Sequence, residues 1–125
     1  MLDSHAFLWV GIGDDRLPGP VRDLIADART KVVVSVATTW DLTLKALAGK
    51  LVLPASPAEH FAEHIDEFGY ELLPVHQRHV TALPELPAIH QDPFDRILVA
   101  QALVEDLDLV SGDERIRRYP IRTIW

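Results

Sequence analysis

Residues 92–113 read DPFDRILVAQALVEDLDLVSGD, a helix pattern that runs directly into a strand pattern. Asp92 before Pro93 is typical of a helix N-terminus, because a capping carboxylate then precedes a proline at the first helical position. We expect this helix to extend to about Asp106. Leu107–Ser111 is short and aliphatic, which predicts a strand. The stretch therefore indicates an α/β fold.

The same alternation continues through the rest of the chain. Further strands are predicted at residues 31–35, 70–74 and 121–124, and further helices at residues 20–28, 38–48 and 57–68. Ser56-Pro57 repeats the capping pattern, while Gly49 and Gly69 suit left-handed helix ends. Prolines and glycines fall singly, so residues 1–125 are interpreted as one domain. Strands alternating with helices predict a mostly parallel sheet covered on both faces.

The composition excludes several classes of protein. A formal net charge of −7 at pH 7 argues against binding nucleic acid mainly through bulk electrostatic attraction. The absence of cysteine excludes disulfides, zinc–thiolate sites and a thiol nucleophile. No apolar run approaches the roughly 18–20 residues of a membrane-spanning helix, and the N-terminus lacks a signal-peptide pattern. We therefore expect a cytoplasmic protein without membrane association.

Four aspartates are predicted to lie at one rim of the sheet. Asp113 comes just after the strand of the opening stretch, and Asp95 lies in the first turn of its helix. Asp3 follows two apolar residues at the N-terminus, and Asp41 lies about one turn into the helix after the 31–35 strand. Ligands of parallel sheets bind beyond the carboxyl ends of the strands, so this rim is the expected site.

Carboxylates gathered in this way raise one another's pKa values and weaken folding unless a cation lies among them. Mg²⁺ or Mn²⁺ prefers oxygen ligands and is commonly held by a few carboxylates together with a substrate phosphate. Such an ion activates water and neutralises the charge that builds on a phosphodiester. The pattern therefore favours a metal site.

Each acid also has an ordinary structural role open to it. Asp95 and Asp113 would cap helices, and Asp41 would pair with Lys45 one turn away. For Asp92, capping is the favoured interpretation. Taken singly, these roles explain each acid as well as catalysis does, but together they require unrelated reasons for acids at one edge. Spacing alone does not identify a nuclease.

Four motifs resemble a known family. They are LDSHA (residues 2–6), SVATTWDL (35–42), HQDPFDR (90–96) and VSGD (110–113). In order and separation, over the whole chain, they resemble PIN domains, specifically the VapC-like toxins of prokaryotic toxin–antitoxin pairs. The resemblance implies a three-layer α/β/α fold, endoribonuclease activity with Mg²⁺ or Mn²⁺, homodimerisation, and inhibition by a cognate antitoxin.

The same resemblance assigns the site residues. The family's acidic quartet falls on Asp3, Asp41, Asp95 and Asp113, which are thereby implied to be both the catalytic residues and the metal ligands. Ser4 follows the first acid and Ser111 precedes the last, and each is implied to orient a carboxylate or a water. For both serines, turn or cap hydrogen bonding is an equally good alternative.

Charged residues near the acidic motifs are candidates for supporting roles. Asp92 and Arg96 flank Asp95 and are expected to support the site. Lys45, Arg115 and Arg117 are candidate contacts to RNA phosphates. The alternative for these basic residues is a solvated face that balances the surplus of acids.

The sequence departs from the family pattern in three places. Asp41 stands where many relatives have glutamate, which shortens that ligand by one methylene. Only Met1 and Leu2 precede Asp3, so the first strand is expected to be truncated. His90, like Asp92, occurs in only part of the family, and its role is left open.

Two groups of apolar residues near the motifs receive different predictions. Trp40, Leu44 and Phe94 fall on apolar helix stripes and are expected to pack in the core. Trp9, with its neighbours Ala6, Phe7 and Leu8, is expected to offer an apolar surface to a second subunit or an antitoxin helix.

Two alternative functions follow from the same residues. One is a PIN-like module that has lost catalysis and binds RNA or protein, which the departures at Asp41 and the first strand favour. The other is a receiver-like phosphoacceptor domain. That fold needs adjacent acids after its first strand, which this chain does not have.

Overall fold

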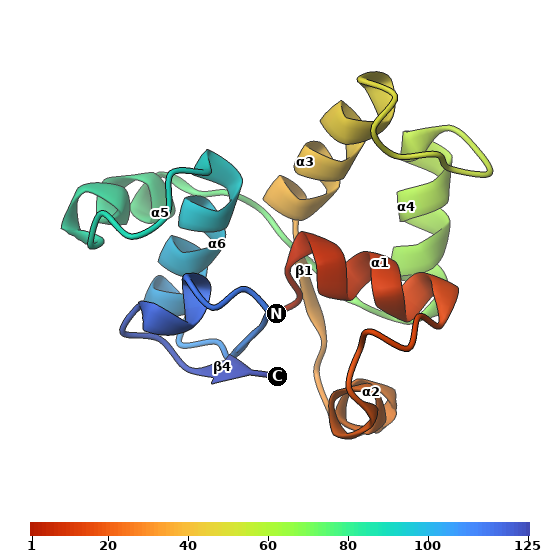
Figure 1. Ribbon diagram of the computed structural model, residues 1–125, viewed down its shortest axis with the longest axis horizontal. Coiled ribbons are helices and arrows are strands. Elements are labelled where there is room, and N and C mark those ends of the chain that lie inside the picture. Colours follow the sequence, from red (N-terminus) through yellow and green to blue (C-terminus); the bar gives the residue numbers. More distant parts are fainter.

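A parallel β-sheet forms the middle layer of the computed structural model, which describes residues 1–125 (Figure 1). On one side, β1 (Val33–Ser35) pairs with β2 (Glu71–Leu73). On the other side, β3 (Leu109–Val110) pairs with β4 (Thr123–Ile124). Leu2 forms parallel bridges to both β1 and β3, so the sheet order is β2-β1-Leu2-β3-β4.

Residues 1–3, which we call the central seam, join the two strand pairs through the backbone. The amide of Leu2 donates to the carbonyl of Val33 over 3.0 Å, and the amide of Asp3 donates to the carbonyl of Val110 over 3.1 Å. In return, the amide of Val110 donates to the carbonyl of Met1 over 2.8 Å. The central seam therefore takes the place of a central strand and carries Asp3 to the carboxyl end of the sheet.

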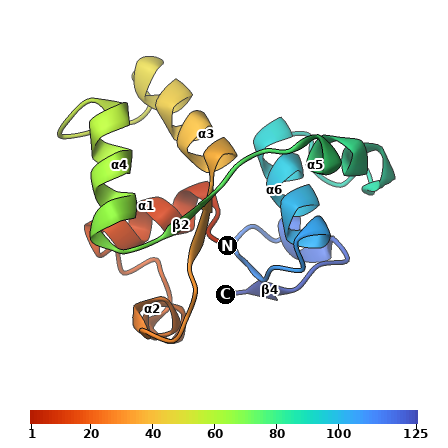
Figure 2. The same cartoon turned by 180° about the vertical axis from the view of Figure 1, so that it is seen from behind.

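Helices cover both faces of the sheet (Figures 1 and 2). One face carries α1 (Ser4–Ile12), α2 (Gly19–Ala26) and α4 (Pro57–Glu67), and the other carries α5 (Gln77–Ala82) and α6 (Pro93–Val104). The helix α3 (Val36–Leu47) leaves the end of β1 and packs on both faces. Two short 3-10 helices span Leu83–Glu85 and Ile116–Arg118. The predicted three-layer α/β/α fold is confirmed.

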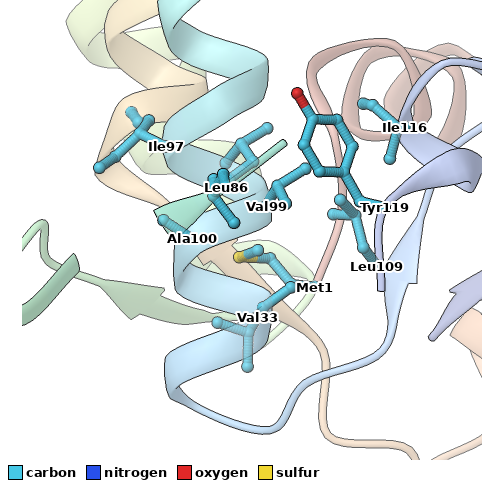
Figure 3. Close-up of a cluster of buried hydrophobic side chains, with 12 residues drawn as sticks. Met1, Val33, Leu86, Ile97, Val99, Ala100, Leu109, Ile116 and Tyr119 are labelled. Atoms are coloured by element: carbon cyan, nitrogen blue, oxygen red, sulfur yellow. The ribbon is translucent and has the colours of Figure 1, made fainter. Parts of the chain in front are cut away.

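The buried apolar side chains form one cluster on each face of the sheet. Neighbouring residues of a strand enter opposite clusters, as the pleat requires. Met1, Val33 and Leu109 pack towards α6 (Figure 3), whereas Leu2, Val34 and Val110 pack towards α1. Because both faces are buried at the centre of the sheet, every side chain of β1 and β3 is buried, and exposed positions do not alternate with buried ones there.

The structure differs from the prediction in the lengths of the strands and in one helix. Each strand pairs over only two or three residues, because pairing depends on the partner strand and not on local composition. The helix α5 was not predicted. Its fully buried His79 lies with Nε2 2.6 Å from a carboxylate oxygen of Glu105, and this contact fastens α5 to the end of α6.

The predictions that Trp40 and Leu44 pack in the core are wrong. Trp40 and Leu44 are 58% and 44% exposed, because α3 buries a stripe centred on Ala37 and Asp41 instead. Phe94 is partly buried and meets Trp40 edge to face, with ring centroids 5.1 Å apart.

The apolar surface predicted around Trp9 is smaller than expected. Ala6 and Phe7 belong to the core, so only Leu8 and Trp9 of that group are partly exposed.

No helix combines the length and the apolar character needed to cross a bilayer.

Candidate active site

Three acids from distant parts of the sequence meet beyond the carboxyl ends of the central strands. Asp3 ends the central seam, Asp113 follows β3, and Asp95 lies in the first turn of α6. The negative charges of Asp3 and Asp113 both act on Asp95, so the three carboxylates lie within electrostatic reach of one another. This is the rim at which the sequence predicted them.

His90 lies between two of these acids. Its Nε2 is 3.1 Å from a carboxylate oxygen of Asp95 and 3.2 Å from a carboxylate oxygen of Asp113. One ligand atom from each of the three side chains lies within 4.8 Å of the others. Because metal–oxygen distances are about 2.0–2.6 Å, a single cation can bridge groups at this separation.

The hydrogen bonds of His90 fix which of its ring nitrogens carries the proton. Its Nδ1 accepts the backbone N–H of Asp92 over 3.1 Å, so this nitrogen presents a lone pair. In the neutral imidazole the proton therefore sits on Nε2, which faces Asp95 and Asp113. His90 thus donates a hydrogen bond to Asp113, with Asp95 close beside it, and does not present a lone pair to a metal.

The loop that carries His90 is held from two sides. The backbone N–H of His90 donates to the hydroxyl of buried Tyr119 over 2.8 Å. Arg96 donates to the carbonyls of Leu83 and Pro87 over 3.0 and 3.2 Å. Arg96 therefore supports the site by fixing the loop before α6, and its guanidinium is engaged with backbone oxygens.

Asp92 has the capping role that was favoured for it. Its carboxylate accepts the backbone N–H of Phe94 over 2.8 Å and that of Asp95 over 3.4 Å. These bonds cap the N-terminus of α6, which begins at Pro93, and fix the direction of its first turn. Asp92 therefore positions Asp95 through the backbone, and its own negative charge also acts on Asp95.

Burial and crowding keep two of the acids from ionising easily. Desolvation raises the pKa of Asp95 to about 6, with further increases from the charges of Asp92, Asp3 and Asp113, while His90 opposes the shift. Desolvation also raises the pKa of Asp3, which is only 4% exposed and caps α1 by accepting the N–H of Ala6 over 2.7 Å. A bound cation would relieve this cost at both positions.

Asp113 behaves in the opposite way. Burial opposes its ionisation, but hydrogen bonds from the side chain and backbone of Arg115 and from His90 outweigh burial and lower its pKa to about 2. The nearest side-chain bond runs from Nη2 of Arg115 to the carboxylate over 3.1 Å. Asp95 and Asp113 thus stand side by side with pKa values pushed far apart, which is a recurring property of functional carboxylates.

Asp41 lies beside this group and belongs to a different set of contacts. Its carboxylate accepts the Ser4 hydroxyl over 2.8 Å and the Lys45 ammonium over 2.6 Å. The structure therefore brings Asp3, Asp95 and Asp113 together, and it joins Asp41 to the neighbour of Asp3 through the Ser4 hydroxyl.

The remaining predicted residues fall into two groups. Ser111 hydrogen-bonds with Asp3 through its side chain and accepts the backbone N–H of Asp113 over 3.2 Å, so it ties two acids to each other. Lys45 and Arg115 are engaged by Asp41 and Asp113, whereas Arg117 is exposed on the short helix after β3.

The bridging position of His90 was not predicted from the sequence. One local signal pointed to it, because a histidine two residues before a helix cap can accept the cap's backbone N–H. The contacts with Asp113 and Tyr119 join residues more than twenty positions apart, and no local pattern reports them.

The donor chemistry of the cluster fits a hard divalent cation. Carboxylate oxygens are the available ligands, and His90 supplies a hydrogen-bond donor to one of them, Asp113. Asp3, Asp95 and Asp113 are the residues that would hold such an ion. Neither the ordinary capping roles nor the ion pairs explain why these three converge.

Comparisons with known proteins agree with this geometry. The model of one protein family, the PIN domain, matches residues 1–122 and so includes every acid described above. A comparison with curated proteins finds no match. PIN domains are generally nucleases and bind divalent metals, as the acid cluster would allow. The chain therefore belongs to the PIN domain family.

Proposed function

We propose that the protein is a Mg²⁺- or Mn²⁺-dependent endoribonuclease that acts as the toxin of a toxin–antitoxin pair. The observation that carries the proposal is the cluster of Asp95 and Asp113 around His90 at the carboxyl end of the sheet, where the charge of Asp3 also acts on Asp95. Family membership supports nuclease chemistry, and the motifs LDSHA and HQDPFDR support the narrower assignment to toxin ribonucleases.

The proposed chemistry depends on the three acids and on His90. Asp3, Asp95 and Asp113 would hold the cation, which would neutralise charge on the scissile phosphate and acidify a water beside it. At neutral pH Asp95, with a pKa of about 6, is largely ionised and able to bind the ion or accept a proton. His90 would support the site by donating its Nε2–H to Asp113, with Nε2 also 3.1 Å from a carboxylate oxygen of Asp95.

Other residues would assist at the edge of the site. Arg115 holds Asp113 and is more than half exposed, so its guanidinium can also meet a phosphate of the substrate. The N-terminus of α6 adds positive potential beside Asp95. Asp41 would complete the site with the help of Ser4, and Lys45 limits the negative charge that it adds.

Two apolar surfaces support the proposed protein partners. A cavity of about 530 Å³ between α3, α5 and α6 is lined by exposed side chains that include Trp40, Val75 and Val80. We assign this face to a second copy of the chain. A second cavity of about 420 Å³ lies between α1, residues 51–54 and α4, and it suits an apolar segment of an antitoxin.

The test is cleavage of total RNA by the purified protein with and without a chelator. We expect cleavage only with Mg²⁺ or Mn²⁺, and none by Asp95→Asn with its circular dichroism unchanged. Expression of the wild type, but not of Asp95→Asn, should stop growth. Cleavage that persists in excess chelator would contradict the metal, and tight RNA binding without cleavage would favour a binding module.

A further inference from the structure

A cavity of about 340 Å³ opens directly beside the acid cluster. It is lined by Asp3 and Asp113 of the site together with His5, Trp9, Arg16 and Trp125. Its volume falls within the range of about 300–1,000 Å³ that is usual for small-ligand pockets. The cavity therefore shares two walls with the proposed metal site while its other walls have a different chemistry.

Those other walls are aromatic. The ring of Trp9 lies between its two neighbours, with centroids 5.5 Å from His5 and 5.7 Å from Trp125. The guanidinium carbon of Arg16 lies 4.8 Å from the centre of the Trp9 ring. Asp14 holds this guanidinium through contacts of 2.6 and 3.0 Å, so the cation is already fixed over the indole.

Gly112 makes room for the last of these rings. A Cβ atom at residue 112 would come within 2.7 Å of two atoms of the Trp125 indole, closer than side chains tolerate. The absence of a side chain between Ser111 and Asp113 thus lets Trp125 lie against the backbone that carries the acid. Trp125 remains 36% exposed, so part of the ring is open to a ligand.

We propose that this cavity, which we call the aromatic pocket, binds one unpaired nucleobase of the RNA strand whose phosphate lies at the acid cluster. This inference rests on the proposed ribonuclease function and specifies the substrate as single-stranded or looped RNA. Aromatic side chains bind bases by stacking, and each such contact contributes a factor of about 5 to 150 in affinity.

The charges around the aromatic pocket favour a neutral ring over other ligands. Two carboxylates, Asp3 and Asp113, line the pocket and would disfavour a phosphate or an acidic peptide inside it. A nucleobase is uncharged and planar. The phosphate attached to it would then lie outside the pocket, near the cation that the same acids hold.

The pocket also excludes paired RNA. A base inside a duplex is covered on both faces by its neighbours and cannot stack on a protein ring. The rings of Trp9 and Trp125 lie with centroids 5.7 Å apart in the wall of one cavity, so a base must leave a duplex to reach them. A duplex would therefore present its backbone to the acids without filling the pocket.

Fluorescence gives a direct test, because the chain has three tryptophans and two of them line the pocket. In an Asp95→Asn, Trp40→Phe variant with chelator present, all indole emission comes from Trp9 and Trp125. We expect a short unpaired oligoribonucleotide to quench this emission and the same strand in a duplex to quench it much less. Equal quenching by both would overturn the proposal.

Substitutions then separate stacking from folding. Trp125→Leu should weaken binding of the unpaired strand by at least about fivefold, whereas Trp125→Phe keeps a ring and should retain most of the affinity. Phe68→Leu is the matched control, since Phe68 is an exposed aromatic outside the pocket. In the active protein, Trp125→Leu should raise KM more than it lowers kcat.

Two results would refute the aromatic pocket independently of catalysis. One is unchanged RNA affinity in Trp125→Leu relative to Phe68→Leu. The other is loss of self-association in Trp125→Leu at unchanged RNA affinity, which would assign the pocket to a protein surface. Because binding is measured without metal or cleavage, a failure of the proposed nuclease activity would leave this readout intact.

Discussion

The Nε2–H of His90 donates to the carboxylate of Asp113 over 3.2 Å, and the backbone fixes this direction because Nδ1 is already occupied by the N–H of Asp92. His90 is therefore a hydrogen-bond donor to the acid cluster in its neutral form. His90 lies close enough to Asp95 and Asp113 to share a metal ion with them. Because its Nε2 carries a proton, however, it supports these carboxylates and is not itself a ligand.

Substitution of His90 separates these two roles. His90→Gln keeps an N–H donor and should retain activity to within about tenfold, whereas His90→Ala should lose about 10- to 100-fold, as other residues behind metal ligands do. The measurement is kcat/KM with Mg²⁺ and with Mn²⁺. A preference that moves from Mn²⁺ to Mg²⁺ in His90→Gln would indicate instead that the imidazole ligates the metal.

Asp95→Asn should make the metal-free protein more stable. The pKa of Asp95 is raised from 3.8 to about 6 by burial, so the folded state holds a proton that the unfolded chain lacks between these values. Stability therefore falls as pH rises through this window, and the full cost, on the order of 2 kcal/mol, is present above about pH 6.

Chemical denaturation in chelator tests this expectation. The gain in unfolding free energy from Asp95→Asn should be largest at about pH 7.5 and fall to roughly half near pH 5. Asp27→Asn is a suitable control, because that carboxylate is partly exposed, lies outside the acid cluster and pairs with Arg29. An equal gain at both values of pH would show that Asp95 is not strained by burial.

Metal binding should show the reverse dependence on pH. Ligating carboxylates must be ionised, so protons compete with the cation as pH falls below the pKa of Asp95, about 6. We expect Mn²⁺ to raise the Tm of the wild type clearly at about pH 7.5 and only slightly at about pH 5. The Asp95→Asn variant should show little stabilisation at either pH.

Gly112→Ala probes the aromatic pocket from the backbone side. The added methyl would lie within 2.7 Å of the Trp125 indole, and the ring must move away from Asp113. We expect weaker binding of unpaired RNA with the Tm changed little, because Trp125 is partly exposed and can rotate. Ser111→Gly serves as a contrast, since it removes a side-chain contact with Asp3 and leaves Trp125 in place.

Leu2→Ala should strongly destabilise the fold. Leu2 is almost fully buried and is the only residue bridged to both halves of the sheet. Truncating a buried leucine costs about 2–5 kcal/mol, and this cavity would open at the centre of the molecule. Leu103→Ala, at an exposed position of α6, is the matched control in a urea titration.

The parts of the fold that were predictable depend on local chemistry. Asp92 before Pro93 and Ser56 before Pro57 identify helix starts, because a cap and a proline act on adjacent backbone groups. The acids at the ends of strands were likewise placed at the correct rim. The α5 helix was missed because its contacts with α6, such as His79 with Glu105, are tertiary.

The candidate site was less predictable than the fold. The sequence predicts Asp3, Asp41, Asp95 and Asp113 at one rim, but the contacts of Asp41 with Ser4 and Lys45 follow from tertiary packing and side-chain geometry. The exposure of Trp40 was missed because its stripe on α3 is apolar but faces solvent. Sequence patterns report which residues share a face, and they do not report what that face meets.

The central seam has a consequence for how activity is lost. The backbone bonds that join β1 to β3 run through residues 1–3, and the last of these residues is the acid Asp3. The two halves of the sheet therefore cannot part without withdrawing a carboxylate from the cluster. Under the proposed function, partial opening along this line would inactivate the protein, because Asp3 would move away from Asp95 and Asp113.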